Sequence, residues 1–164
     1  RLHNEIVHLL DVESPSDEMR ANRQSVLKEL TKIVCEVYPS ATVDVFGSEA
    51  MDTVTHSSDL DIALTIPLEP QLRAKDSSDC DSDSEEDKGT IEKQKPEDVG
   101  TMMLRISRHL QKAGICSYVE IINARVPIIK MDHAATGVGV DIIINNDTGL
   151  HAAMLMRKFM KKYH

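Results

Sequence analysis

The stretch VFGSEAMDTVTHSSDLDIAL, residues 45–64, contains the pattern that decides the fold. A short apolar segment ends at Gly47 and Ser48, and a second apolar segment contains Asp59 and Asp61, separated by one residue. In a strand, alternate residues share a face, so these two carboxylates would lie about 7 Å apart on one face. Like charges at this distance resist ionising together. The pattern therefore predicts a strand whose polar face accepts a positively charged group.

The composition is that of one folded domain. The chain has 164 residues and is 41% hydrophobic, which is enough to bury a core. No apolar run reaches the roughly 18 residues that a membrane-spanning helix needs, so we expect no membrane partner. Because the chain begins at Arg1 and stops within a helical pattern, we interpret it as a fragment of a longer protein. Three widely spaced cysteines without a Cys-x-x-Cys pair indicate a reducing compartment.

The net charge of −8 is concentrated in one acidic tract. Residues 76–88 contain seven acids and one lysine, a net charge of −6, which leaves −2 for the rest of the chain. The tract belongs to a low-complexity segment over about 73–98 that is too polar to bury, and we predict that it is a disordered insert. A nearly neutral remainder is compatible with a nucleic-acid partner, because lysine and arginine still gather near the C-terminus.

Helical and strand patterns are interspersed along the chain. Ser16 is placed to cap a helix, and Gly114 is placed to end another. The expected helices cover 16–37, 101–113 and 154–163, with a short helix after Ser48, and the expected strands cover 42–46, 59–66, 118–124, 126–133 and 138–144. This order predicts an α/β or α+β fold, in which helices flank a mixed β-sheet.

Two groups of residues in this arrangement carry chemistry. Gly47 lets a ligand approach the backbone, and Ser48 can both cap the following helix and donate to a phosphate. Asp141 lies in the strand 138–144, and if that strand neighbours 59–66, then Asp59, Asp61 and Asp141 converge. Three such carboxylates would bind two Mg²⁺ ions about 4 Å apart, and Asp141 would also help to take a proton from an attacking hydroxyl.

The same residues, in the same order, resemble those of the DNA polymerase β-like nucleotidyltransferase superfamily. The segments ARVPIIK (124–130) and VDIIINN (140–146) make the chain similar to the branch of terminal uridylyltransferases and related poly(A) RNA polymerases. The resemblance implies a polymerase β-like core and an enzyme that adds uridylates or adenylates to single-stranded RNA 3′ ends. It also implies a cytoplasmic location, with the nucleus as the alternative.

The resemblance assigns roles to the site residues. Gly47 and Ser48 would hold the nucleoside triphosphate, UTP or ATP. Asp59 and Asp61 would bind both metal ions, Mg²⁺ or Mn²⁺, and Asp141 would bind the catalytic ion and activate the RNA 3′-hydroxyl. That hydroxyl would attack the α-phosphate, and pyrophosphate would leave.

The resemblance also divides the chain. Residues 1–150 would form the catalytic domain, interrupted by the acidic insert at about 73–98, and 151–164 would begin a helical second domain. In the family that second domain selects the nucleotide, so the choice between UTP and ATP stays open, as does the oligomeric state.

Two positions depart from the family pattern. Asp52 stands where many relatives have glycine, and Ala152 stands where an asparagine usually contacts the sugar. These departures support an alternative, a catalytically weak or inactive relative that binds RNA or protein. Arg125 either supports a strand or faces RNA, and the sequence assigns no role to Lys130.

Overall fold

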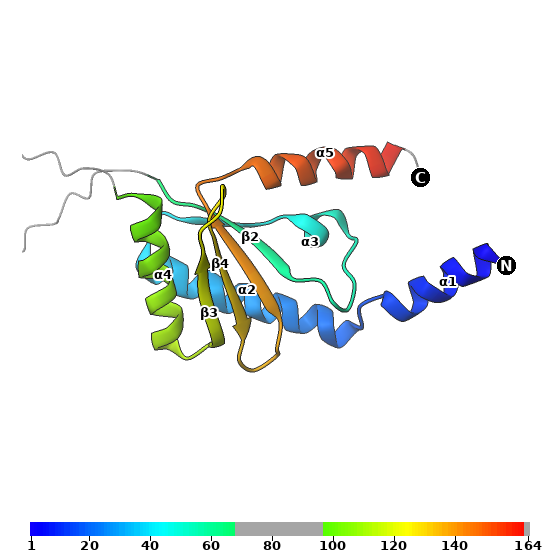
Figure 1. The fold of residues 1–164 in the computed structure, drawn as a ribbon, viewed down its shortest axis with the longest axis horizontal. Helices are drawn as coiled ribbons and strands as arrows, with labels where there is room; N and C mark the ends of the chain where they lie inside the picture. Colours follow the sequence, from blue (N-terminus) through cyan, green and yellow to red (C-terminus); the bar gives the residue numbers. More distant parts are fainter. Residues whose placement is uncertain (68–96, 163–164) are drawn as a thin grey trace, which may run out of the picture.

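A computed structural model describes residues 1–67 and 97–162 of the chain (Figure 1). The acidic insert predicted over about 73–98 lies outside the described residues, except for Glu97 and Asp98 at its end. The helices are α1 (Leu2–Glu13), α2 (Asp17–Val37), α3 (Gly47–Met51), α4 (Val99–Ala113) and α5 (Thr148–Lys162). The strands are β1 (Thr42–Val45), β2 (Leu60–Thr65), β3 (Cys116–Ile122), β4 (Ile128–His133) and β5 (Gly139–Ile144).

The strands form one mixed sheet in the order β1-β2-β5-β4-β3. β2 and β5 run parallel, and the other neighbours pair antiparallel. The predicted fold class, a mixed sheet flanked by helices, is therefore confirmed. The expected adjacency of the two aspartate-bearing strands is confirmed as well, because Asp61 and Asp141 are direct partners across the β2–β5 pair.

Local signals account for most of the helix ends. The Ser16 side chain accepts a hydrogen bond from the Met19 N–H at 3.2 Å and caps α2, as predicted. Gly114 ends α4 in the left-handed conformation, with φ of 70°. The last helix begins at Thr148 and not at residue 154. The Asn146 side chain accepts a hydrogen bond at 3.1 Å from the N–H of Thr148, the first residue of this helix.

The core lies between one face of the sheet and the helices α2 and α4. Each fully buried aliphatic side chain contributes about 1.5–3 kcal/mol to folding, and alternation along each strand leaves the opposite face of the sheet to polar residues. The core side chains are Val26, Leu30, Ile33 and Val34 of α2, Met102, Met103, Ile106 and Leu110 of α4, and Leu60, Ile62, Ile129, Met131, Val140 and Ile142 of the strands.

Two helices lie apart from this core. α1 buries no residue against the rest of the described chain, and Figure 1 shows it extending away from the sheet. α5 packs against α3 through the buried Ala153 and has several exposed apolar side chains. Among the described residues, no helix combines the length and the apolar character needed to cross a membrane.

Candidate active site

The polar face of the sheet carries a row of charged side chains across four strands. Asp61 of β2 pairs with Asp141 of β5, Asp141 pairs with Lys130 of β4, and Lys130 pairs with Glu120 of β3. Side chains that are directly opposite on neighbouring strands point to the same face. The sheet register alone therefore brings two aspartates and one lysine together.

Asp59 joins this row from the loop that enters β2. The Lys130 ammonium donates to Asp59 Oδ2 at 2.9 Å and to Asp141 Oδ1 at 3.3 Å, so it bridges the two carboxylates. We call Asp59, Asp61, Asp141 and Lys130 the carboxylate cluster. All three predicted aspartates lie in it, and Lys130 is a member that the sequence analysis left without a role.

The carboxylate cluster contains three acidic side chains and one basic side chain. The pKa of Asp61 is raised above its ordinary value, first by burial and then by the neighbouring charges of Asp141 and Asp59. Lys130 and Arg23 act in the opposite direction and lower it. Burial and the two neighbouring carboxylates thus outweigh Arg23 and Lys130, and a further positive charge beside Asp61 would favour its ionised form.

Two glycines make room for these carboxylates. Gly47 has a φ of +58°, and a Cβ at this position would overlap the Asp61 carboxylate. A Cβ at Gly139 would overlap the carboxylate of Asp59. Gly47 thus serves the site by admitting Asp61 against the backbone, a role that the sequence analysis did not include.

A buried arginine fixes the position of the loop before β2. Arg23 of α2 is 3% exposed, and its Nε donates to Glu49 Oε2 of α3 at 2.7 Å. Its two terminal nitrogens donate to the carbonyl oxygens of Ser58 at 2.7 Å and Asp59 at 3.0 Å. Arg23 therefore ties α2, α3 and the start of β2 together directly behind the carboxylates.

Ser48 lies in the first turn of α3, so the prediction that it caps this helix is wrong. The residue at the N-cap is Phe46, with extended backbone and no side-chain cap. The helix begins at Gly47, two residues earlier than expected. Ser48 remains beside Gly47 and partly exposed, and its predicted phosphate contact stays a prediction.

The structure gives a physical reason for the departure at Asp52. Asp52 ends α3 in the left-handed region, with φ of 58°, which is the conformation that glycine adopts most easily. Its side chain is 85% exposed and lies 3.7 Å from Arg20 Nη1.

Ala152 and Arg125 are both exposed, the first on α5 and the second in the β3–β4 loop.

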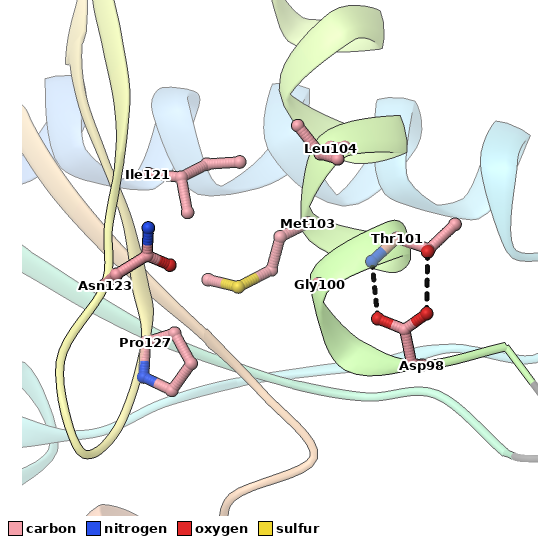
Figure 2. Close-up of a pocket in the computed structure, with 8 residues that line it drawn as sticks. All are labelled: Asp98, Gly100, Thr101, Met103, Leu104, Ile121, Asn123 and Pro127. Atoms are coloured by element: carbon pink, nitrogen blue, oxygen red, sulfur yellow. Dashed lines mark hydrogen bonds between the residues drawn. The ribbon is translucent and has the colours of Figure 1, made fainter.

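Neither of two pockets in the described part of the chain is lined by a carboxylate of the cluster. The larger, about 390 Å³, lies between the start of α4 and the β3–β4 hairpin (Figure 2). Its only acid, Asp98, accepts hydrogen bonds from the Thr101 N–H at 3.0 Å and the Thr101 hydroxyl at 2.8 Å. The other, about 260 Å³, lies between α3 and α5 and is lined by Glu49, Ala153 and Arg157 among others. The side chains of Asp59 and Asp141 are 43% and 24% exposed, so solvent reaches these carboxylates.

The donor atoms of the cluster fit a divalent cation. Asp59, Asp61 and Asp141 offer hard carboxylate oxygens, the ligands preferred by Mg²⁺ and Mn²⁺. As they stand, no three acidic, histidine or cysteine side chains in the described part of the chain are arranged closely enough to hold a metal ion. Lys130 meanwhile engages one oxygen each of Asp59 and Asp141. The chemistry of the donors suits a divalent ion, and Lys130 now uses part of it.

One signal in the sequence points to Arg23. It occupies the apolar stripe of α2, three residues before Val26 and seven before Leu30, and a charged residue in such a stripe needs buried partners. Lys130 and Gly139 offer no comparable signal, because their importance depends on which strands pair and in which register.

Comparisons with known proteins agree on one family. Residues 2–161 match the family described as poly(A) RNA polymerase, mitochondrial-like, central palm domain. Poly(A) RNA polymerase cid14 of Schizosaccharomyces pombe is 29% identical over 162 residues, which are 98% of this chain and 20% of that protein. Human terminal uridylyltransferase 7 is 26% identical over 138 residues, 84% of this chain and 8% of that protein.

A solved structure shares the fold. The GLD-2/RNP-8 complex superimposes with a TM-score of 0.72 at 22% identity, over 96% of this chain and 42% of that one. The chain spans a fifth or less of the length of the two curated relatives.

Proposed function

The chain belongs to the family of mitochondrial-like poly(A) RNA polymerase central palm domains, and from this premise we propose that the protein is an RNA 3′-terminal nucleotidyltransferase. It adds adenylates or uridylates from ATP or UTP to the 3′ end of single-stranded RNA. Family membership confirms the resemblance to nucleotidyltransferases predicted from the sequence. Both nucleotides stay in the proposal, because the relatives are named for polyadenylation and for uridylylation.

The observation that carries the proposal is the meeting of three carboxylates, two from paired strands of the sheet and one from the loop that enters β2. Asp61 and Asp141 face each other across the parallel pair β2–β5, and Lys130 links Asp141 to Asp59. The pKa of Asp61 is raised first by burial and then by the charges of Asp141 and Asp59. A fold rarely gathers uncompensated carboxylates on an open face unless a cation completes them.

We assign Mg²⁺ or Mn²⁺ to this cluster, with Asp59, Asp61 and Asp141 as the residues that hold the ions. Bound there, divalent ions supply Lewis-acid stabilisation of the phosphate charges and ease deprotonation of the attacking hydroxyl. Arg23 holds the Asp59 backbone in place, and the empty space at Gly47 lets Asp61 reach the site.

The transfer exchanges one phosphorus–oxygen bond for another. The RNA 3′-oxygen forms a bond to the α-phosphorus of the nucleotide, the bond from that phosphorus to the bridging oxygen of the β-phosphate breaks, and pyrophosphate leaves with the electron pair. Asp141 accepts the hydroxyl proton directly or through water. We assign the nucleotide phosphates to the backbone around Gly47 and Ser48, because this segment lies against Asp61.

One argument for the alternative, an inactive RNA- or protein-binding relative, is weakened by the structure. The Asp52 carboxylate is directed toward Arg20 at the surface, and it has no contact with the carboxylate cluster. The left-handed backbone of Asp52 accounts for the glycine in relatives without any reference to nucleotide binding. Ala152 remains as the one departure that the alternative rests on.

A primer-extension assay on the full-length protein tests the proposal. The protein is incubated with a 5′-labelled single-stranded RNA, Mg²⁺ or Mn²⁺, and each nucleoside triphosphate in turn. The test variant is Asp59→Asn with Asp61→Asn, and the matched control is Asp44→Asn on the exposed position of β1. We expect extension with ATP or UTP that the control retains and the double variant loses. A folded protein that extends RNA with no nucleotide would favour the binding module.

A further inference from the structure

We propose that Lys130 is a resident counter-ion that must leave Asp59 and Asp141 before a divalent cation binds the cluster. In this view metal binding is an exchange of one cation for another, and Lys130 is a positioning residue that sets the affinity for the ion. The inference rests on the proposed function, since it concerns the same three carboxylates.

The fold places the Lys130 backbone rigidly and leaves its side chain movable. Lys130 lies between Ile129 and Met131, both fully buried, and β4 is hydrogen-bonded on both edges, to β3 and to β5. The Lys130 side chain itself is 36% exposed. A four-carbon stem on a fixed strand can therefore move its ammonium without any change in the sheet.

The other nearby cation cannot take the place of Lys130. The Arg23 guanidinium donates to Glu49 and to the backbone carbonyls of Ser58 and Asp59, and these bonds occupy its Nε and both terminal nitrogens. Its charge lowers the pKa of Asp61, but its hydrogen bonds go to Glu49 and to backbone carbonyls and to no carboxylate of the cluster. Within the cluster, the contacts to Asp59 and Asp141 are made by Lys130.

Lys130 and a divalent ion need the same atoms. The ammonium engages Asp59 Oδ2 and Asp141 Oδ1, and a cation held jointly by these two aspartates would use oxygens that Lys130 now bonds. Two positive groups at that position would also repel each other strongly. Lys130 in this position therefore opposes the binding of a metal ion by Asp59 and Asp141.

The structure also offers the released ammonium another carboxylate. Glu120 faces Lys130 directly across the β3–β4 pair, at a separation typical of interacting side chains. The Tyr118 hydroxyl donates to Glu120 and holds it on the exposed edge strand. Lys130 can therefore exchange Asp59 and Asp141 for Glu120 by rotation of its side chain alone.

The counter-ion role and a purely structural role of Lys130 predict opposite changes in metal affinity when Lys130 is removed. If Lys130 only supported the aspartates, its loss would disorder them and weaken metal binding. If it competes with the ion, its loss removes the competitor and strengthens binding, while the metal-free protein loses stability. We expect Lys130→Met to bind Mn²⁺ about three- to tenfold more tightly, as two partly exposed ion pairs would give.

The experiment measures Mn²⁺ binding to the full-length protein by electron paramagnetic resonance, at one fixed pH and without nucleotide. The proteins are wild type, Lys130→Met, Lys130→Arg, Glu120→Gln and the double variant Asp59→Asn with Asp61→Asn. Lys130→Arg keeps a cation that grips carboxylates more firmly, so it should bind Mn²⁺ at least twofold more weakly than wild type. Glu120→Gln removes the alternative partner and should weaken binding about twofold.

The outcomes separate this inference from the proposed function. Unchanged or weaker Mn²⁺ binding by Lys130→Met, with wild type binding normally, overturns the counter-ion role alone. If Lys130→Met does not fold, equal or tighter binding by Lys130→Arg overturns it instead. If wild type binds no more Mn²⁺ than the double variant, the metal site of the proposed function fails, and the counter-ion role fails with it.

Discussion

The carboxylate cluster and a second charged group, at the junction of α2 and α4, differ in how their charges are balanced. In the second group, which we call the Tyr38 cluster, the Tyr38 hydroxyl donates to Glu97 Oε2 at 3.0 Å. Arg105 Nη2 lies 3.2 Å from Glu97 Oε1, and its guanidinium carbon lies 5.7 Å from the centre of the Tyr38 ring. The Tyr38 cluster thus has one acid and one base, whereas the carboxylate cluster has three acids and one lysine.

The difference separates a structural group from a site. In the Tyr38 cluster, burial and the hydrogen bond to Glu97 raise the pKa of Tyr38 to about 12, so its hydroxyl stays a donor at any physiological pH. In the carboxylate cluster, burial and like charges raise the pKa of Asp61, which costs stability at neutral pH. Proteins commonly retain such a cost where function requires it.

The largest expected effect comes from removing the support behind the carboxylates. Arg23→Met leaves the Glu49 carboxylate and the Ser58 carbonyl without their buried partner, and we expect a loss of about 3–5 kcal/mol in unfolding free energy. Urea unfolding measures it. Arg20→Met is the matched control, because Arg20 is half exposed and its ion pair should contribute less than about 0.5 kcal/mol. Similar losses in both variants would contradict the role of Arg23.

A substitution in the Tyr38 cluster should cost less unfolding free energy and should leave metal binding unchanged. Tyr38→Phe removes a hydroxyl from Glu97, so we expect a loss of about 1–2 kcal/mol in unfolding free energy. The packing of the ring is retained, and Mn²⁺ binding should be unchanged. The measurement is urea unfolding, followed by Mn²⁺ titration of the folded variant. A change of metal affinity beyond twofold would show that the two groups are coupled.

Removing one negative charge from the carboxylate cluster should increase the stability of the metal-free protein. Asp61→Asn removes one of three like charges without changing the shape of the side chain, and we expect the metal-free protein to gain about 1 kcal/mol at pH 7, or about 2–4 °C in Tm. The measurement is a thermal melt in EDTA. A lower Tm at pH 7 would mean that the Asp61 charge stabilises the fold.

The pH dependence of this gain follows from the direction of the shift. Because the pKa of Asp61 is higher in the folded protein than its ordinary value of 3.8, the folded state holds the proton longer as pH rises. Wild type therefore loses stability relative to Asp61→Asn as pH rises from below 3.8 through the raised value. We expect the difference in Tm to shrink at acid pH, and a constant difference across that window would rule out this origin.

The contrast between the two groups also explains what sequence could predict. Asp59, Asp61 and Asp141 interrupt apolar segments, and that local pattern singled them out, while their convergence depended on the pairing of β2 with β5. The role of Lys130 depends on the register of β4 against β5, which alternation does not specify. The Tyr38 cluster joins residues 59 positions apart in sequence, and no local pattern indicates such a pair.

The smallest effect is expected for Asp52, and substitutions there test whether this fourth acid acts on the carboxylate cluster. Asp52→Gly relieves the left-handed backbone but increases the entropy of the unfolded chain, and these terms should cancel to within about 0.5 kcal/mol. Since the Asp52 carboxylate points to Arg20, Mn²⁺ affinity should stay within twofold of wild type. Asp52→Asn, which keeps a side chain without charge, is the control. A tenfold change in Mn²⁺ affinity in both variants would place Asp52 in the electrostatic field of the site, and its charge would then have to be counted with those of Asp59, Asp61 and Asp141.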